Sequence, residues 1–355
     1  MSQSPLVPVS PVPPTPDHAG SARAAHDPRP AARPRSPLAA LARGAWRMAT
    51  LNGKVMTGSA IVTVFVLVAI FGPLLIHQNP LLYTHTLVQP PSAAHWLGTN
   101  QGGQDVFAQL VVGTRTSLVW AFATGLLVLL ISVTVGLVSG YFGGVVDDVL
   151  SLITNVFLII PGFPLAIIAV QYFSRTTLTI ALVVALTNWP WGARVLRAQT
   201  LSMRNREFVT AARATGEVAW RTIFCEILPN QISIVAASFI TTTIQVLLAV
   251  AGLEFLGFGN TTTVSWGNML YAAYNGSGLL LGAWWWFAPP GLCIALLGAG
   301  LALLNFGIDE LADPRLRQKG RRARFAARAG ALGRLWQGRN ARARGAPGHE
   351  KVADV

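Results

Sequence analysis

Residues 206–230 read REFVTAARATGEVAWRTIFCEILPN, a charged and amphipathic stretch between long apolar segments. Asn205 is a suitable N-cap, and Glu207 suits the positive end of a helix. The apolar and small residues that recur at helical spacing are Phe208, Ala211, Ala212 and Thr215. We therefore predict a short helix that ends near Ala214, where Gly216 takes the left-handed conformation.

A second amphipathic helix should follow that glycine. Its apolar residues are Val218, Ile223, Phe224 and Ile227. The helix should end near Leu228, because Pro229 disfavours a helical conformation in the residue before it. Taken by periodicity alone, the two helices would be interfacial helices that cover the end of a bundle.

The rest of the composition indicates a membrane protein. Hydrophobic residues make up 52% of the 355 residues and charged residues only 12%, well below the share of roughly 25% in soluble domains. Six apolar stretches can each hold the roughly 20 helical residues that cross a bilayer, although 176–193 must extend towards Arg197. They are 55–76, 116–146, 149–174, 176–193, 227–253 and a segment within 279–308. We predict an all-α integral membrane protein with six transmembrane helices.

The distribution of basic residues predicts the orientation of these helices. Of the 27 Lys and Arg residues, 25 lie before the first stretch, in 194–221, or from Arg315 onwards. Six spans place these three regions on one side and leave Arg115 and Arg175 on the other. By the positive-inside rule, both termini and the 194–221 loop are cytoplasmic. The protein should therefore be a multi-pass component of the inner (cytoplasmic) membrane.

The two ends of the chain differ from this apolar centre. Residues 1–54 hold ten of the 22 prolines and should form a disordered Pro/Arg-rich cytoplasmic tail. Residues 314–355 form a basic cytoplasmic tail, for which we favour contact with anionic membrane lipid, or disorder, over nucleic acid. Between them we expect a transmembrane helix with an outer loop at 55–112 and the main transmembrane domain at 113–313.

The segment AARATG followed by EILPN resembles the EAA loop of bacterial ABC importer permeases. In that family a glycine-broken helix pair, the coupling helix, docks into a groove on the ATPase subunit. Ala211, Ala212 and Gly216 match the two-alanine and glycine positions, whereas Thr210 replaces the glutamate that names the motif. The resemblance implies an ATPase-coupling site composed of Glu207, Thr210, Ala211, Ala212, Arg213, Gly216, Leu228 and Pro229.

Further segments resemble the same family, in order, over about Thr50 to Leu316. They are HWLGTNQGGQDVFAQLVVGTRTSL from His95, GYFGGVVDD from Gly140, LEFLGFG from Leu253, SWGNML from Ser265 and DPRL from Asp313. In the first segment, Asn100 and Gln104 replace an Asp and an Arg of the family pattern, which removes two charges that could have paired. The chain is similar to the C-type permease subunit of dipeptide, oligopeptide and nickel importers, and a type I importer transmembrane domain is expected.

The resemblance implies alternating access driven by other subunits. They are a homologous second permease subunit, one or two ABC ATPase subunits and an extracytoplasmic solute-binding protein. None of the three lysines fits a P-loop, so we expect no ATP hydrolysis, no cofactor and no enzymatic activity in this chain. The spacing of His77, His85 and His95 gives no support to a metal site.

Two alternatives to an importer subunit follow from the residues. A self-sufficient secondary transporter or channel predicts buried ion-coupling charges, for which Glu254 is the single candidate. A membrane enzyme predicts a catalytic constellation, which the sequence does not contain. Di- or oligopeptides are the solutes that the resemblance favours, although the residues themselves do not identify the solute.

Four residues are candidates for a translocation path. Pro161, Pro164 and Pro190 interrupt two adjacent spans, as hinges that line a path would. Glu254 is an acid deep in an apolar stretch, which is by default a functional candidate. For Glu254 we favour a place in contact with water near the outer end of the fifth span over a role facing the lumen.

Overall fold

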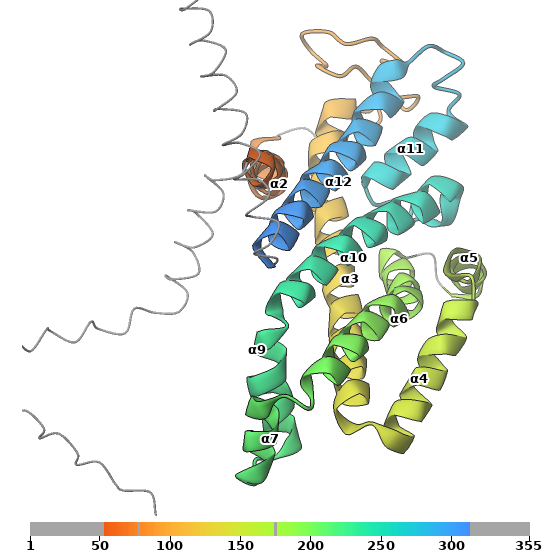
Figure 1. The fold of residues 1–355 in the computed structure, drawn as a ribbon. Coiled ribbons are helices and arrows are strands. Elements are labelled where there is room, and N and C mark those ends of the chain that lie inside the picture. The colour runs from red at the N-terminus through yellow and green to blue at the C-terminus, as the bar shows by residue number, and fades with distance from the viewer. Residues whose placement is uncertain (1–52, 77–78, 174–175, 313–355) are drawn as a thin grey trace, which may run out of the picture. The chain divides into compact units, whose positions relative to one another are not determined.

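The computed structural model describes residues 53–76, 79–173 and 176–312, and within them the secondary structure is helical apart from one isolated bridge, Thr99 to Asp105 (Figure 1). The predicted tail 314–355, and all of the tail 1–54 except its last two residues, lie outside the described residues. The helices are α2 (Gly53–Leu75), α3 (Val106–Phe142), α4 (Gly144–Ile159), α5 (Gly162–Tyr172), α6 (Thr177–Met203), α7 (Glu207–Ala214), α8 (Ala219–Arg221), α9 (Leu228–Asn230), α10 (Ile232–Leu253), α11 (Trp266–Asn275) and α12 (Trp284–Ala312), with π-helical turns η1 (Thr222–Ile227) and η2 (Glu254–Phe258).

Four helical segments are long and apolar enough to cross a membrane: α2, α3, α10 with η2, and α12. The pair α4 and α5 would make a fifth span, bent by 85° at the break between them. The apolar stretch predicted at 149–174 is therefore broken near Pro161, one of the prolines expected to interrupt it. Helix α4 already begins at Gly144, and Pro161 at the start of α5 adopts an extended conformation that ends the first helix.

Helix α3 begins ten residues before the predicted stretch at 116. The Asp105 side chain accepts a hydrogen bond from the Ala108 backbone N–H at 2.8 Å and so caps the helix at Val106. The same carboxylate contacts His95 Nδ1 at 2.7 Å. Hydropathy alone does not detect this start, because Arg115 interrupts the apolar run within the helix.

Small residues allow α3 and α6 to pack closely. A Cβ added at Gly136 would lie 2.7 Å from the Ala193 carbonyl oxygen, and one at Gly140 would lie 2.6 Å from Thr200 Cβ. The Ser132 hydroxyl donates to the Trp189 carbonyl oxygen at 2.8 Å. The Gly-x-x-x-Gly spacing at 136–140 thus faces α6, as small residues do at close helix crossings in membranes.

A charged cluster joins α3, α4 and α6 near the end of the bundle that carries α7. Asp147 on α4 accepts from Arg197 Nε at 2.5 Å and Arg197 Nη2 at 2.7 Å. It also accepts from the hydroxyls of Ser139 at 2.5 Å and Ser151 at 3.1 Å. The carboxylate is thereby paired and fully hydrogen-bonded, which is the condition for placing a charge among apolar helices.

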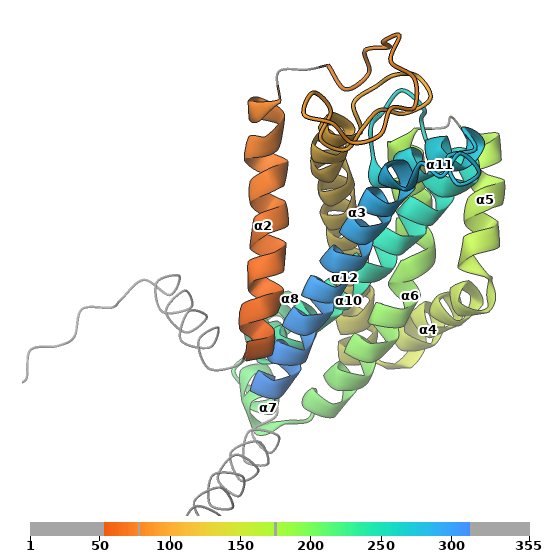
Figure 2. The same ribbon diagram turned by 90° about the horizontal axis from the view of Figure 1, so that it is seen from above.

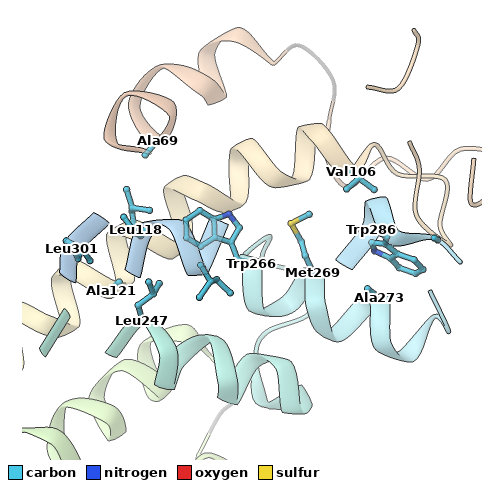
Figure 3. Packing of buried hydrophobic residues seen from close by; sticks show 13 residues of the cluster. Ala69, Val106, Leu118, Ala121, Leu247, Trp266, Met269, Ala273, Trp286 and Leu301 are labelled. Carbon is cyan, nitrogen blue, oxygen red and sulfur yellow. The ribbon is translucent and has the colours of Figure 1, made fainter. Parts of the chain in front are cut away.

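The largest apolar core lies among α2, α3, α10, α11 and α12 (Figure 3). The Trp266 side chain is fully buried at its centre and meets Phe65 of α2 edge-on, with ring centroids 5.6 Å apart. Trp286 at the start of α12 is buried beside Ala273 of α11. These aromatic side chains connect α11, which is too short to span a membrane, to the long helices.

The segment at 79–105 is held by a network of three buried amide side chains. Asn100 Nδ2 and Gln109 Nε2 each donate to Gln104 Oε1 at 2.8 Å. Gln104 and Gln109 also donate to the carbonyl oxygens of Leu81 and Pro80, at 3.1 Å each. Asn100 and Gln104, which replace the Asp and Arg of the family pattern, therefore contact each other through neutral amides in place of an ion pair.

Candidate functional site

The first half of the 206–230 stretch forms the short helix that its residues predict. Helix α7 runs from Glu207 to Ala214, and Gly216 follows with a φ of +76°. The Gly216 N–H donates to the Arg213 carbonyl at 3.0 Å, and the Glu217 N–H donates to the Ala212 carbonyl at 3.1 Å. This pair of bonds is a Schellman motif, so the glycine turn is confirmed together with its mechanism.

The predicted N-cap of this helix is wrong. Arg206, one residue after Asn205, occupies the cap position with an extended backbone, and its side chain makes no capping bond. The Arg206 carbonyl instead accepts from the N–H groups of Val209 and Thr210, each at 3.0 Å. Glu207 lies in the first turn, where its charge favours the positive end of the helix.

The second half is a helical run from Ala219 to Asn230 whose central turn, η1, is π-helical. The predicted end near Leu228 is wrong by two residues. Leu228 remains helical, with φ −58° and ψ −44°, and donates to the Ile223 carbonyl five residues back. The wider turn is compatible with Pro229, which has no N–H to bond within the helix. The run ends at Gln231, whose side chain donates to the Thr200 hydroxyl at 3.0 Å.

One side of this helix pair is anchored in the bundle. Val209, Ile223 and Ile227 have no exposed surface and pack in one cluster with Leu137 of α3 and Leu196 of α6. Fully burying each such side chain contributes roughly 1.5–3 kcal/mol, so the pair is fixed to the bundle by its apolar side. Figures 1 and 2 both show α7 at the end of the bundle opposite the 79–105 segment.

A second connection runs from α7 to α3 through a cation and a ring. The Arg213 guanidinium lies 4.5 Å from the centroid of the Tyr141 ring, and Arg213 Nε donates to the Tyr141 hydroxyl at 3.3 Å. Tyr141 is itself buried near the end of α3. Helix α7 is therefore held to α3 by a directional contact as well as by apolar packing.

The pair also carries exposed apolar side chains. Val218, Trp220 and Phe224 are 71%, 56% and 41% exposed, and the two aromatic rings stack at 5.8 Å and 10°. Six residues of the predicted site are also exposed: Glu207, Thr210, Ala211, Arg213, Gly216 and Pro229. We call Val218, Trp220 and Phe224 together with these residues the exposed face. Ala212 and Leu228 are half-buried at its edge. Sequence reasoning missed Trp220, although an exposed aromatic beside Phe224 is an unusual residue for a solvated loop.

The four path candidates lie apart from this face. Pro161 and Pro164 are exposed at the break between α4 and α5, whereas Pro190 is buried inside α6. Glu254 begins η2 directly after α10 and is only 3% exposed, so the expectation that it touches water is wrong. The Ser265 hydroxyl donates to its carboxylate at 2.7 Å, and Gly259 and Gly267 leave the space that the side chain fills.

These features define a multi-pass helical membrane protein with an anchored amphipathic helix pair at one end of its bundle. The chain belongs to the family of inner membrane components of binding-protein-dependent transport systems, which matches residues 132–318.

Similar proteins are permease subunits. The chain is 32% identical to the dipeptide transport system permease protein DppC of Alkalihalophilus pseudofirmus over 280 residues, which cover 78% of this chain and 90% of the relative. It is 30% identical to the oligopeptide transport system permease protein OppC of Bacillus subtilis over 283 residues, covering 77% and 90%. A solved inward-facing structure of the MetNI methionine ABC transporter matches with a TM-score of 0.45 and 19% identity, covering 58% of this chain and 95% of that chain.

Proposed function

We propose that this chain is the permease subunit of an ATP-driven ABC importer and that the exposed face of the 206–230 stretch is its ATPase-coupling site. The observation that carries the proposal is that the stretch combines buried anchoring side chains with exposed apolar ones. Val209, Ile223 and Ile227 anchor it in the bundle, while Val218, Trp220 and Phe224 remain uncovered. An apolar surface of this kind on a rigid base suits a protein partner.

The importer would work by alternating access, with ATP hydrolysis on one or two partner ATPase subunits. A homologous second permease subunit and an extracytoplasmic solute-binding protein complete the proposed assembly. Di- or oligopeptides are the proposed solutes, because the similar permeases named for their solutes carry these two classes. Movement would reach the spans through Val209 and through the contact of Arg213 with Tyr141.

We further propose six spans, with both termini and the exposed face in the cytoplasm. Helix α6 is the span that completes this set, in addition to the four apolar helices and the bent pair α4 and α5. It carries Arg194 and Arg197 towards its end. Arg197 is neutralised by Asp147, and Arg194 donates to Asn155 at 2.8 Å, so that both cations have a polar partner. The partition of basic residues supports the orientation.

The first test is substitution of Gly216. A Cβ at this position would meet no described atom within 4 Å, so Gly216→Val acts on the backbone alone. A β-branched residue at positive φ costs on the order of 1–2 kcal/mol and should deform the turn. We expect the variant to insert normally but to lose ATPase co-purification or solute-stimulated ATP hydrolysis. Gly216→Asn is the matched control, because Asn tolerates the left-handed conformation.

Loss of co-purification would indicate failed docking, whereas retained docking with uncoupled hydrolysis would indicate failed transmission. If Gly216→Val transports as well as the wild type in an assembled complex, the coupling assignment is wrong. The helix pair would then be an interfacial cover of the bundle.

The second test adds a charge to the exposed face. Ala212→Asp introduces a carboxylate at a half-buried position, where a protein partner would have to bury it unpaired. We expect ATPase co-purification to fall at least about tenfold, since an uncompensated charge costs several kcal/mol. Ser202→Asp adds the same charge at an exposed position of α6 outside the face and serves as the control. Equal retention of the ATPase by both variants would exclude Ala212 from the interface.

A further inference from the structure

A groove lined with neutral polar side chains runs along α6, α10 and α12. Two cavities of about 290 and 480 Å³ share Asn188, Trp191 and Gln245 and therefore form one groove. Volumes of this size suit small-molecule ligands. We call this the polar groove, and its polar lining consists of Thr187, Asn188, Ser233, Ser238, Thr241, Thr242, Gln245 and Asn305.

Helix α10 supplies most of this lining from one face. Ser233, Ser238, Thr241, Thr242 and Gln245 recur at helical spacing along it. Val235, Val246 and Val250 lie on its other side and are buried. This helix is one of the candidate spans, and polar side chains in a span face protein or water rather than lipid.

The polar groove offers hydrogen bonds without charge. Of the described residues that line it, none carries a formal charge. Ser233, Thr241 and Gln245 are exposed. Thr241 donates to the Ala237 carbonyl at 3.0 Å, which leaves the lone pairs of its oxygen free to accept. Within the described part of the chain, the buried Asn305 Oδ1 has no hydrogen-bond partner.

These groups match an uncharged amide-containing solute. Hydroxyl and amide side chains both donate and accept, as backbone amides do. Pro190 lies between Asn188 and Trp191 in sequence but does not line the cavities, and neither do Pro161, Pro164 and Glu254. The earlier path candidates are thus adjacent to the groove or distant from it.

We propose that the polar groove is this chain's part of the translocation path, and that it binds the solute by neutral hydrogen bonds without selecting for the solute's charge. The inference rests on the proposed function and adds to it the residues of the path and the chemistry of recognition. Any preference for charged solutes would then arise outside this groove. The rival occupant is a helix of a second subunit, which the following experiment distinguishes.

The experiment introduces opposite charges at one groove position. The complex is purified with its native partners and reconstituted in proteoliposomes carrying Thr241→Asp or Thr241→Lys. ATP-dependent uptake of Ala-Ala-Ala, Ala-Lys-Ala and Ala-Glu-Ala is measured and divided by wild-type uptake of the same peptide, which cancels the preference of the binding protein. We expect Thr241→Asp to raise the Lys-to-Glu uptake ratio on the order of fivefold and Thr241→Lys to lower it similarly. Non-specific damage would change both variants in the same direction.

A near-isosteric variant covers the case in which a charged residue prevents assembly. In a Cys225→Ser, Cys293→Ala background, Thr241→Cys is treated in the assembled complex with a cationic or an anionic thiosulfonate. The two reagents should shift the uptake ratio in opposite directions.

A cysteine at 241 that does not react in the complex would mean that a subunit covers the groove, and it would overturn the proposal. Reaction without any change in the ratio would overturn it as well. Absence of ATP-dependent uptake by the wild type for all three peptides would instead contradict the proposed function.

Discussion

At the scale of single residues, Asp147 and Arg197 illustrate what holds a charge among apolar helices. The carboxylate accepts four hydrogen bonds from three helices, and both side chains are mostly removed from solvent. Removing one partner of such a pair leaves a charge without compensation, which costs more than the intact pair contributes.

We therefore expect Arg197→Met to lower stability by about 1–3 kcal/mol, the range between exposed and buried ion pairs. The double variant Asp147→Asn, Arg197→Met should recover part of this loss, because it removes both charges and keeps a side chain that bonds the serines. Thermal unfolding of the purified protein in detergent measures both effects. If the double variant is no more stable than Arg197→Met alone, the pair is not a coupled unit.

At the scale of elements, the contact between α3 and α6 determines how closely two long helices approach. The glycines of α3 differ in the space available for a side chain. A Cβ at Gly136 or Gly140 would come within 2.7 Å of α6, whereas a Cβ at Gly113 on the same helix would lie 3.5 Å from Ser265.

Gly136→Ala and Gly140→Ala should each destabilise the protein by about 1–3 kcal/mol, because the added methyl group meets backbone or Cβ atoms that cannot move independently. Gly113→Ala should be neutral or stabilising by up to about 1 kcal/mol, since alanine favours a helix more than glycine does. Thermal unfolding of the three variants distinguishes them. Equal stability of all three would mean that α3 and α6 adjust their separation freely.

Elements also show which features local sequence predicts. The end of α7 at Ala214 and the turn at Gly216 follow from rules that act over four residues, and both predictions are confirmed. The burial of Glu254 depends on Ser265 and on two glycines from another segment, so no local rule detects it. The break between α4 and α5 was indicated by Pro161 and Pro164, but its angle of 85° depends on packing.

The two candidate sites also differ in how far local sequence predicts them. The exposed face was predicted from the motif, because Ala, Gly and Pro at fixed spacing have backbone consequences. The polar groove was missed, since its lining comes from three helices that are adjacent only after folding. A signal was present in the spacing of Ser233, Ser238, Thr241 and Gln245, which places neutral polar groups on one face of an apolar helix.

At the scale of the whole molecule, the proposed orientation can be tested with single cysteines in a Cys225→Ser, Cys293→Ala background. Leu280 is 87% exposed in the turn between α11 and α12, and Val218 is 71% exposed on the exposed face. In intact cells an impermeant maleimide should label Leu280→Cys and should label Val218→Cys only after permeabilisation, because the positive-inside rule puts these positions on opposite sides. Labelling of Val218→Cys in intact cells would reverse the orientation.

The amide network of Asn100, Gln104 and Gln109 affects how the 79–105 segment responds to the medium outside the cell. In the proposed orientation it supports the segment that meets the external medium, whose acidity and salinity the cell does not control. Asn and Gln side chains neither gain nor lose protons over the biological range, and neutral hydrogen bonds are not screened by dissolved ions as an ion pair is. A chain that replaces an Asp and Arg pair with amides therefore gives up electrostatic attraction, and in return the hydrogen bonds of this network do not depend on the pH or the salt concentration outside the cell.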